Sequence, residues 1–238
     1  MSIFKTLINI IPILLGAIII FLLLNFNSAD KPGIEAYVKE QNIQRKELED
    51  KTLVFTGSST ETAMIFYPGA NVEYNSYEPL MAACAKRGIM SILVKMPLNF
   101  AFLNYNAANR IKKYFPEVKN WYIGGHSNGG QFASVHVSKY YKDYKGLIIL
   151  GSISSFKDLS NIDIKALSII GSEDGIVKMS IYKRYKKNLP KDLREYIIPG
   201  GCHSYFGMHG LQKFDGTPNI TNIEQIEFSA DKISEFIN

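Results

Sequence analysis

The residues with the clearest chemical meaning form a Gly-x-Ser-x-Gly pentapeptide, Gly-His-Ser-Asn-Gly, at 125–129. It lies between an apolar run at 121–123 and a helix-compatible stretch at 131–140. A strand that turns sharply into a helix holds a serine in a strained, exposed conformation, and the flanking glycines permit that turn. Ser127 is therefore a candidate nucleophile. The alternative is a loop that is merely rich in glycine and serine.

A histidine suited to activating such a serine follows a late predicted strand. The strand covers 195–198, and the loop Pro-Gly-Gly-Cys-His-Ser follows at 199–204. His203 would accept the serine proton as a general base and later donate it to the leaving group. The alternatives are an ordinary surface histidine here, or His209 as the base.

A carboxylate that could orient this histidine follows another predicted strand. The apolar run at 166–170 predicts a short buried strand, and the Gly/Asp-rich run at 171–177 predicts the loop that leaves it. Asp174 is the candidate acid, because an Asp-Gly turn would fix it in place. Glu173 is the alternative, and a turn without chemistry is another.

Acyl chemistry also needs two backbone N–H groups that bind the oxyanion. The residue after the nucleophile, Asn128, supplies one of them. The predicted strand at 64–67 leads into Pro-Gly-Ala-Asn at 68–71, where Ala70 is the second candidate donor and Asn71 the alternate. An ordinary Pro-Gly turn would explain the same four residues.

The elements that must position these residues alternate between strand and helix. This alternation predicts parallel βαβ units with right-handed crossovers, and the apolar runs predict strands buried on both faces. The segment at 151–164 is too short for an inserted lid domain, so we expect an open site. We predict a hairpin from 52–55 and 63–67, further strands at 89–94 and 147–150, helices near 78–86, 101–114 and 178–187, and a last helix that begins at a Thr221–Glu224 capping box.

These motifs resemble the α/β-hydrolase superfamily, and more narrowly its small, lidless bacterial branch related to dienelactone hydrolases. The resemblance implies an α/β-hydrolase fold, with a mostly parallel sheet flanked by helices, and a triad of Ser127, Asp174 and His203. Cys202 departs from the pattern, where a polar residue such as Asn is expected, which puts the packing of that loop in question. The resemblance runs from about Met64 to the C-terminus and is most specific at 67–70, 94–99, 124–130 and 200–207.

Several residues are candidates for substrate contact. Lys95 and Met96 follow a central strand at its carboxyl end, where ligands collect in open α/β sheets. Asn71 lies beside the candidate oxyanion donor. Phe206 belongs to the segment at 204–218, which we expect to form one wall of the pocket.

Composition limits the partners of the chain. The formal charge of the 238 residues is +5, but the lysines are scattered and no nucleic-acid motif accompanies them, so we expect a solvated basic surface and no nucleic-acid binding. Weak attraction to an anionic membrane is consistent with this charge. The two cysteines, Cys84 and Cys202, form no metal-binding or disulfide pattern, and we expect free thiols with Cys84 buried. We expect no metal, no organic cofactor and no obligate protein partner.

The N-terminal region predicts a membrane segment. Residues 7–24 are almost uninterruptedly apolar and follow Lys5, which favours a single-pass anchor at 1–26 with a cytoplasmic N-terminus and an exported catalytic domain. A linker at 27–50 and the hydrolase domain at 51–238 would follow. The alternative is a signal peptide, whose cleavage would release a secreted protein.

The sequence thus favours a membrane-anchored serine hydrolase that acts on small-molecule carboxylic esters or lactones through an acyl-enzyme on Ser127. An acyltransferase would use the same triad, with a hydroxyl acceptor in place of water. A non-catalytic binding module that keeps the fold is the alternative from a different class.

Overall fold

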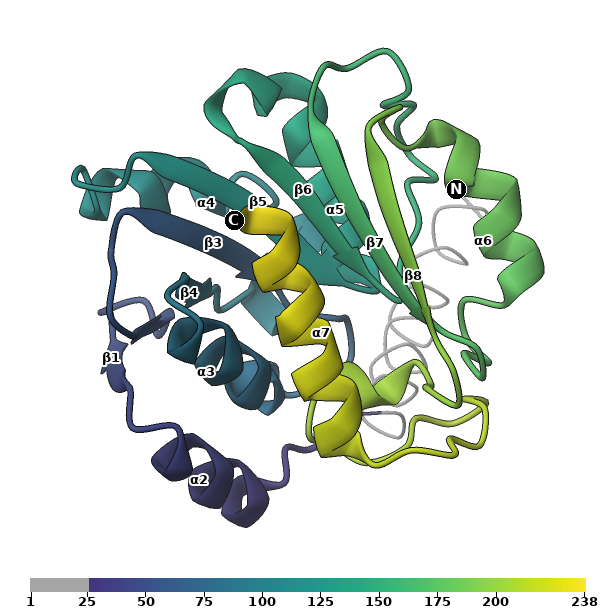
Figure 1. Ribbon diagram of the computed structural model, residues 1–238, viewed down its shortest axis with the longest axis horizontal. Coiled ribbons are helices and arrows are strands. Elements are labelled where there is room, and N and C mark those ends of the chain that lie inside the picture. Colours follow the sequence, from purple (N-terminus) through teal and green to yellow (C-terminus); the bar gives the residue numbers. More distant parts are fainter. Residues whose placement is uncertain (1–25) are drawn as a thin grey trace, which may run out of the picture.

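An eight-stranded sheet runs through residues 26–238, the part of the chain that the computed structural model describes (Figure 1). The strands are β1 (Gln44–Glu47), β2 (Leu53–Thr56), β3 (Thr62–Tyr67), β4 (Met90–Leu93), β5 (Asn120–His126), β6 (Gly146–Leu150), β7 (Lys165–Gly171) and β8 (Leu193–Ile198). They lie in the order β1-β2-β4-β3-β5-β6-β7-β8. All neighbours from β4 to β8 pair in parallel, whereas β2 is antiparallel to both β1 and β4. The predicted mostly parallel sheet is confirmed.

Burial follows the position of each strand in the sheet. Every residue of the inner strands β4 and β6 is buried, because helices cover both faces, and this explains their unbroken apolar sequences. The edge strand β1 is exposed throughout, and the other edge strand, β8, is mostly half-buried or exposed.

Helices cover both faces of the sheet. Figure 1 shows α3 and α7 in front of the sheet, and α4 and α5 behind it. Side chains of α2, α3 and α7 pack into one apolar core, and those of α4 and α5 pack into the other. The predicted capping box at Thr221 and Glu224 is present at the start of the last helix. The helices are α2 (Lys31–Glu40), α3 (Glu78–Lys86), α4 (Ala107–Ile111), α5 (Asn128–Tyr140), α6 (Met179–Tyr185) and α7 (Asn222–Ile237).

Two predicted elements are wrong. The segments that form β2 and β3 do not make a hairpin, because β4 lies between them: the crossover through α3 returns the chain there, and β2 then pairs with β4. The helix predicted at 101–114 is broken into two short 3-10 turns around α4. Asn104 leaves the helical region at φ −152°, which ends the first turn.

Residues 27–50, predicted as a linker with a short helix, carry α2 and β1. Ile34 and Tyr37 of α2 are buried, and β1 extends the sheet beyond β2. Arg45 also binds Glu78 through two hydrogen bonds of 2.6 and 3.1 Å. The predicted anchor at 1–26 lies outside the described residues except for Phe26. Within residues 26–238, no helix has the length and apolar character needed to span a membrane.

Candidate active site

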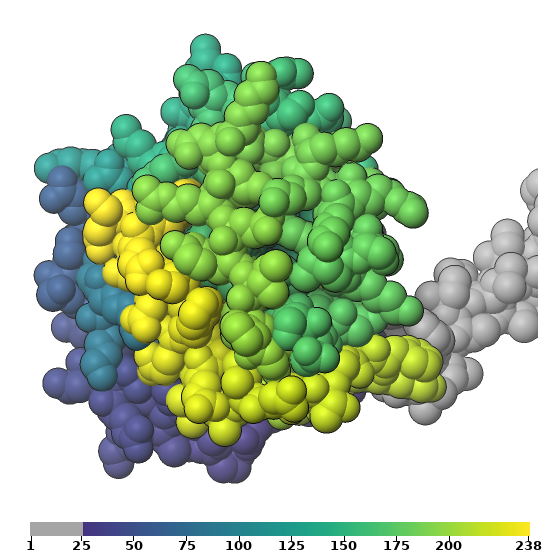
Figure 2. Space-filling view, turned by 45° about the vertical axis from the view of Figure 1, so that its right-hand side comes forward, coloured from purple at the N-terminus to yellow at the C-terminus, as the bar shows by residue number. Residues whose placement is uncertain are grey.

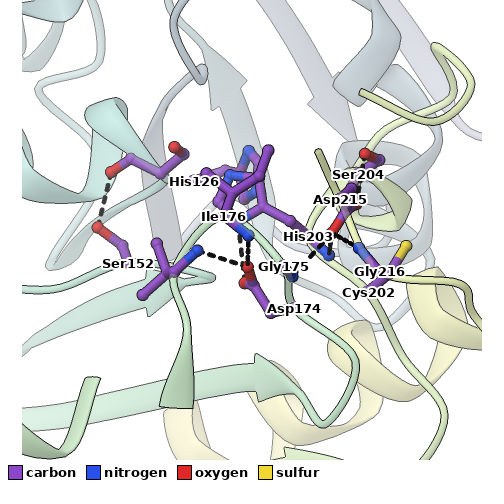
Figure 3. Close-up of polar contacts among 12 residues, drawn as sticks. His126, Ser152, Asp174, Gly175, Ile176, Cys202, His203, Ser204, Asp215 and Gly216 are labelled. Carbon is purple, nitrogen blue, oxygen red and sulfur yellow. Dashed lines mark hydrogen bonds and ion pairs between the residues drawn. The ribbon is translucent and has the colours of Figure 1, made fainter. Parts of the chain in front are cut away.

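Ser127 occupies the turn between β5 and α5 in a strained conformation. Its φ of 51° and ψ of −122° fall outside the regions that non-glycine residues normally adopt. A Cβ at Gly129 would lie only 2.1 Å from the carbonyl oxygen of Tyr67, so the helix approaches β3 too closely for any other residue. The Ser152 hydroxyl donates a hydrogen bond of 2.6 Å to the Ser127 carbonyl and braces the turn (Figure 3). The pentapeptide therefore forms the sharp turn from strand to helix that its glycines predict.

His203 and Asp174 form a buried pair. Asp174 Oδ2 lies 2.9 Å from His203 Nδ1, and each side chain is only 1% exposed. The second oxygen, Asp174 Oδ1, accepts hydrogen bonds from the backbone N–H groups of Ile176 (3.0 Å) and Val177 (2.6 Å). The carboxylate is thereby held from both sides, as Figure 3 shows for the contacts of His203 and Ile176. Glu173, the alternative acid, is exposed and accepts a hydrogen bond from Ser172.

The parallel sheet brings this pair to the edge that carries Ser127. The three residues follow β5, β7 and β8, whose carboxyl ends share one edge. The His203 ring lies 4.5 Å, centroid to centroid, from the ring of His126, the residue before Ser127. No hydrogen bond joins the Ser127 hydroxyl to His203 within residues 26–238. Such hydrogen bonds are often long when no substrate is bound.

The two candidate oxyanion donors lie at the same edge. Asn128 is the first residue of α5, so its N–H has no acceptor within the helix and points along the positive end of the helix dipole. Ala70 follows β3 in the loop that approaches the start of α5. In the part of the chain described, neither of these two N–H groups donates a hydrogen bond. Asn71, the alternate, adopts a left-handed φ of 62°.

Tyr77, for which no sequence motif gave a signal, connects this loop to the serine turn. The Gly69 N–H donates to the Tyr77 hydroxyl at 3.2 Å, and the same hydroxyl shares a hydrogen bond of 2.7 Å with His126 Nδ1. Both side chains are completely buried, and burial raises the pKa of Tyr77 so that its phenol stays protonated. One buried phenol therefore connects the loop that contains Ala70 to the turn that contains Ser127.

The candidate substrate contacts have different environments. The Lys95 ammonium lies 4.2 Å from the centre of the Tyr74 ring, and partial burial lowers its pKa. Met96 and Phe206 are fully buried, and the Phe206 ring packs 5.3 Å from the His126 ring. Phe206 therefore packs against the residue that precedes Ser127, and Met96 belongs to the apolar core. Across residues 26–238, no group of three or more His, Cys, Asp or Glu is arranged to hold a metal ion.

Comparison with known proteins agrees with this geometry. The model of a family described as "Alpha/beta hydrolase family" matches residues 63–227, which is well over half of the chain. The chain belongs to the alpha/beta hydrolase family. None of the curated proteins compared with it gives a significant match.

Solved structures share the fold of this alpha/beta hydrolase at low sequence identity. Est1E from Butyrivibrio proteoclasticus is 14% identical with a TM-score of 0.58, covering 82% of this chain and 96% of Est1E. A dienelactone hydrolase from Anabaena variabilis is 14% identical with a TM-score of 0.61, covering 81% and 96% of the two chains. TT1662 from Thermus thermophilus is 12% identical with a TM-score of 0.60, covering 83% and 99%. These likenesses establish the fold.

Asp215 of this alpha/beta hydrolase lies in the segment expected to form a wall of the pocket, but its sequence did not reveal how it holds the site together. Its carboxylate accepts hydrogen bonds from the backbone N–H groups of His203 (3.2 Å), Ser204 (2.7 Å) and Gly175 (3.1 Å), so it joins the histidine loop to the acid loop (Figure 3). Burial acts to raise the pKa of Asp215, but hydrogen bonds from the Ser204 hydroxyl and from the backbone N–H groups of Ser204, Gly175 and Gly216 outweigh it and hold the pKa below its usual value. The carboxylate is therefore ionised at neutral pH.

Gln225 of α7 explains how the loop around Cys202 packs without a polar side chain at that position. Its side-chain oxygen accepts from the Cys202 N–H at 3.0 Å, and its amide donates to the Cys202 carbonyl at 2.7 Å. The backbone of the loop is satisfied without a polar side chain at 202, and the thiol is buried. Both cysteines are free and buried, as predicted for Cys84.

Buried neutral histidines make the fold sensitive to acid. Burial lowers the pKa of His136 and His209 to about 4, and that of His126 well below its usual value. Unfolding restores a pKa of about 6.5, so stability is complete above pH 6.5 and declines as the pH falls toward 4. At pH 5, His136 and His209 should each cost about 2 kcal/mol of unfolding free energy. Thermal unfolding of the full chain in detergent between pH 7 and pH 4.5 measures this loss.

The His136→Gln variant measures the contribution of one of these histidines to the pH dependence of stability. His136 is a residue of α5 that is not part of the His203–Asp174 pair, and its Nε2 lies 2.9 Å from the Tyr144 hydroxyl. We expect the unfolding free energy of the variant to fall less steeply between pH 6.5 and 5, because its unfolding takes up about one proton fewer. An unchanged slope would mean that His136 is already protonated in the folded protein.

Proposed function

We propose that this alpha/beta hydrolase is a membrane-anchored serine hydrolase that cleaves carboxylic esters or lactones. The observation that carries the proposal is the strained backbone of Ser127, which a serine without a special role would not need. The buried pair of His203 and Asp174 at the same edge of the sheet supports it. One structure that shares the fold is a dienelactone hydrolase, which is consistent with this class of substrate.

The proposed reaction proceeds through an acyl-enzyme. The Ser127 hydroxyl attacks the acyl carbon while His203 takes its proton, and the N–H groups of Ala70 and Asn128 bind the resulting oxyanion. The oxyanion collapses, the alcohol leaves with the proton from His203, and an ester of Ser127 remains. Water then attacks this ester with His203 as the base again, and the acid is released.

The surroundings of His203 suit the proton transfers that this reaction requires. Asp174 stabilises the imidazolium and fixes the ring so that Nε2 faces away from the carboxylate. The ring of His126, which contacts the same ring at a tilt of 49°, is neutral at working pH because burial lowers its pKa. It therefore adds no like charge when His203 takes up the serine proton.

Anchorage in a membrane is the second part of the proposal. The apolar run at 7–24 is long enough to cross a bilayer, and a lysine precedes it. With the N-terminus in the cytoplasm, the hydrolase domain would lie on the outer side of the membrane.

Labelling with a fluorophosphonate probe tests both parts. We expect the full chain to be labelled in the membrane fraction, because an activated serine attacks the phosphorus and stays covalently modified. The Ser127→Ala variant should lose all labelling, and the Ser152→Ala variant, which keeps the nucleophile, should retain it. A folded wild-type protein that is never labelled would contradict the catalytic part, and label found only in the soluble fraction would contradict the retained anchor.

A further inference from the structure

Exposed apolar side chains gather at one edge of this protein. Within residues 26–238, eleven large hydrophobic side chains are exposed, and seven of them lie outside α-helices and strands, in segments that follow or adjoin the carboxyl ends of the parallel strands. A scattered distribution would be unremarkable on a soluble surface, but a concentration at one edge marks an interaction site. The seven are Phe26, Leu98, Phe102, Leu103, Phe156, Leu211 and Phe214.

This edge is also the edge of the candidate active site. Leu98, Phe102 and Leu103 follow β4, and Phe156 follows β6, on either side of the strand that leads to Ser127. Phe132 in the second turn of α5 joins the two groups, since its ring centre lies 6.1 Å from that of Phe102 and 5.5 Å from that of Phe156. The apolar surface therefore extends to the helix that begins at the nucleophile.

The histidine loop extends the same surface on the far side of the site. Leu211 and Phe214 lie in the segment between β8 and α7, shown yellow-green along the lower edge of the domain in Figure 2. This segment also contains His203 and Asp215. Apolar side chains thus flank the candidate triad on both sides.

The two most exposed members of the surface also have unfavourable backbones. Leu98 is 82% exposed at φ 51°, and Phe214 is 80% exposed at φ 72°. A left-handed conformation favours Gly or Asn and is unusual for large apolar residues. Both side chains stay largely in water after folding, so little burial compensates the backbone cost at either position, although the Lys213 ammonium lies 5.1 Å from the centre of the Phe214 ring. The backbone cost is explained if the side chains are buried in a partner.

The chain enters the domain at this edge. The Asn27 N–H donates to the Asn71 carbonyl at 3.0 Å, and the Glu73 N–H donates to the Asn27 carbonyl at 2.9 Å. Asn27 is thereby fixed to the loop that follows β3, the loop of Ala70. The apolar run at 7–24 ends only a few residues before this point. A membrane anchor there would hold the active-site edge within a few residues of the bilayer.

Taken together, these observations identify the partner as a lipid bilayer. We infer that the active-site mouth of this protein faces the membrane, that its apolar rim inserts among the lipids, and that its substrates are esters held in the bilayer. The inference rests on the proposed function and names its class of substrate. The exposed charges at the edge are mixed, with Lys157 and Lys213 beside Asp158 and Glu173, so insertion depends on apolar contact and little on lipid charge.

Depth-dependent quenching tests the orientation without requiring catalysis. The full chain is reconstituted in phosphatidylcholine vesicles that contain brominated lipid, and tryptophan is introduced as Phe156→Trp or, as a control, Tyr114→Trp. The exposed fractions are similar, 60% and 55%, but Tyr114 lies in the segment that leads to the amino-terminal end of β5, at the opposite edge. The unmodified chain, with its single tryptophan, supplies the baseline.

We expect brominated lipid to quench most of the emission added by Phe156→Trp and little of that added by Tyr114→Trp. Equal quenching of the two, or none at position 156, would overturn the proposed orientation. Loss of probe labelling at Ser127 would instead contradict the proposed function, so the two failures are distinguishable.

Turnover tests the class of substrate. Leu98→Asn and Phe214→Asn, combined in one variant, remove two apolar contacts and place a residue that tolerates left-handed backbone at each position. We expect the melting temperature to hold or rise, and hydrolysis of a long-chain ester in vesicles to fall by at least about tenfold. Hydrolysis of a short, water-soluble ester should stay within about twofold, since Ser127 and its partners are untouched.

The control is Tyr114→Asn, which should change neither activity. Equal losses on both substrates in the Leu98→Asn/Phe214→Asn variant would overturn the inference, because they would place the effect in the chemistry. Unchanged hydrolysis in vesicles would overturn it as well.

Discussion

Replacing His203 with alanine is expected to lower kcat for a soluble ester by about a million-fold, because no other group can then take the proton from Ser127. KM should change little, since the imidazole acts mainly in the transition state. Steady-state kinetics with a short-chain ester measures this. The control is His209→Gln: His209 is buried near the site, but neither of its ring nitrogens has a hydrogen-bond partner within residues 26–238. A larger loss in the control than in His203→Ala would make His209 the base.

Replacing Asp174 with asparagine is expected to lower kcat by about ten-thousand-fold while the protein stays folded. The asparagine oxygen can still accept the N–H groups of Ile176 and Val177, so the loop keeps its hydrogen bonds. Its amide would then face His203 Nδ1 as a donor. The imidazole would carry its proton on Nε2, the wrong nitrogen for accepting the serine proton, and the imidazolium would lose its counter-charge.

Glu173→Gln is the matched control for that variant, because it makes the same chemical change at the neighbouring residue. The Glu173 side chain is exposed and, within residues 26–238, accepts a hydrogen bond only from Ser172, so we expect its replacement to change kcat by less than about tenfold. Near-normal turnover in Asp174→Asn, together with a large loss in Glu173→Gln, would transfer the acid role to Glu173.

Local sequence was sufficient for much of the architecture. Short apolar runs that alternate with helix-forming stretches define the parallel strands β3 to β7, because a strand buried on both faces must be apolar throughout. The turn at Ser127 was also predictable, since Gly125 and Gly129 are the residues that a close approach of helix and strand demands. The Thr221 cap is likewise a purely local signal. The apolar run at 7–24 remains a prediction, because it lies outside the described residues.

Contacts between distant segments were not predictable in this way. Nothing in residues 52–67 indicates that β4 lies between β2 and β3, because strand order depends on the path of the crossover through α3. Only the folded chain shows that Asp174, and not Glu173, meets His203. The residues that hold the site in place, Tyr77, Asp215 and Gln225, carry no motif, since each acts through hydrogen bonds to backbone or side chains far away in sequence.

The exposed apolar surface likewise depends partly on local sequence and partly on tertiary structure. The sequence determined which residue types were available for chemistry and in which order the strands would present them, because strand and helix periods are properties of neighbouring residues. Only the tertiary structure decided that Leu98, Phe156 and Phe214, from three separate loops, are exposed at the edge of the sheet that carries the candidate active site. An apolar residue in a loop has the same local pattern whether it packs inward or outward. Its exposure is set by what the rest of the chain places around it.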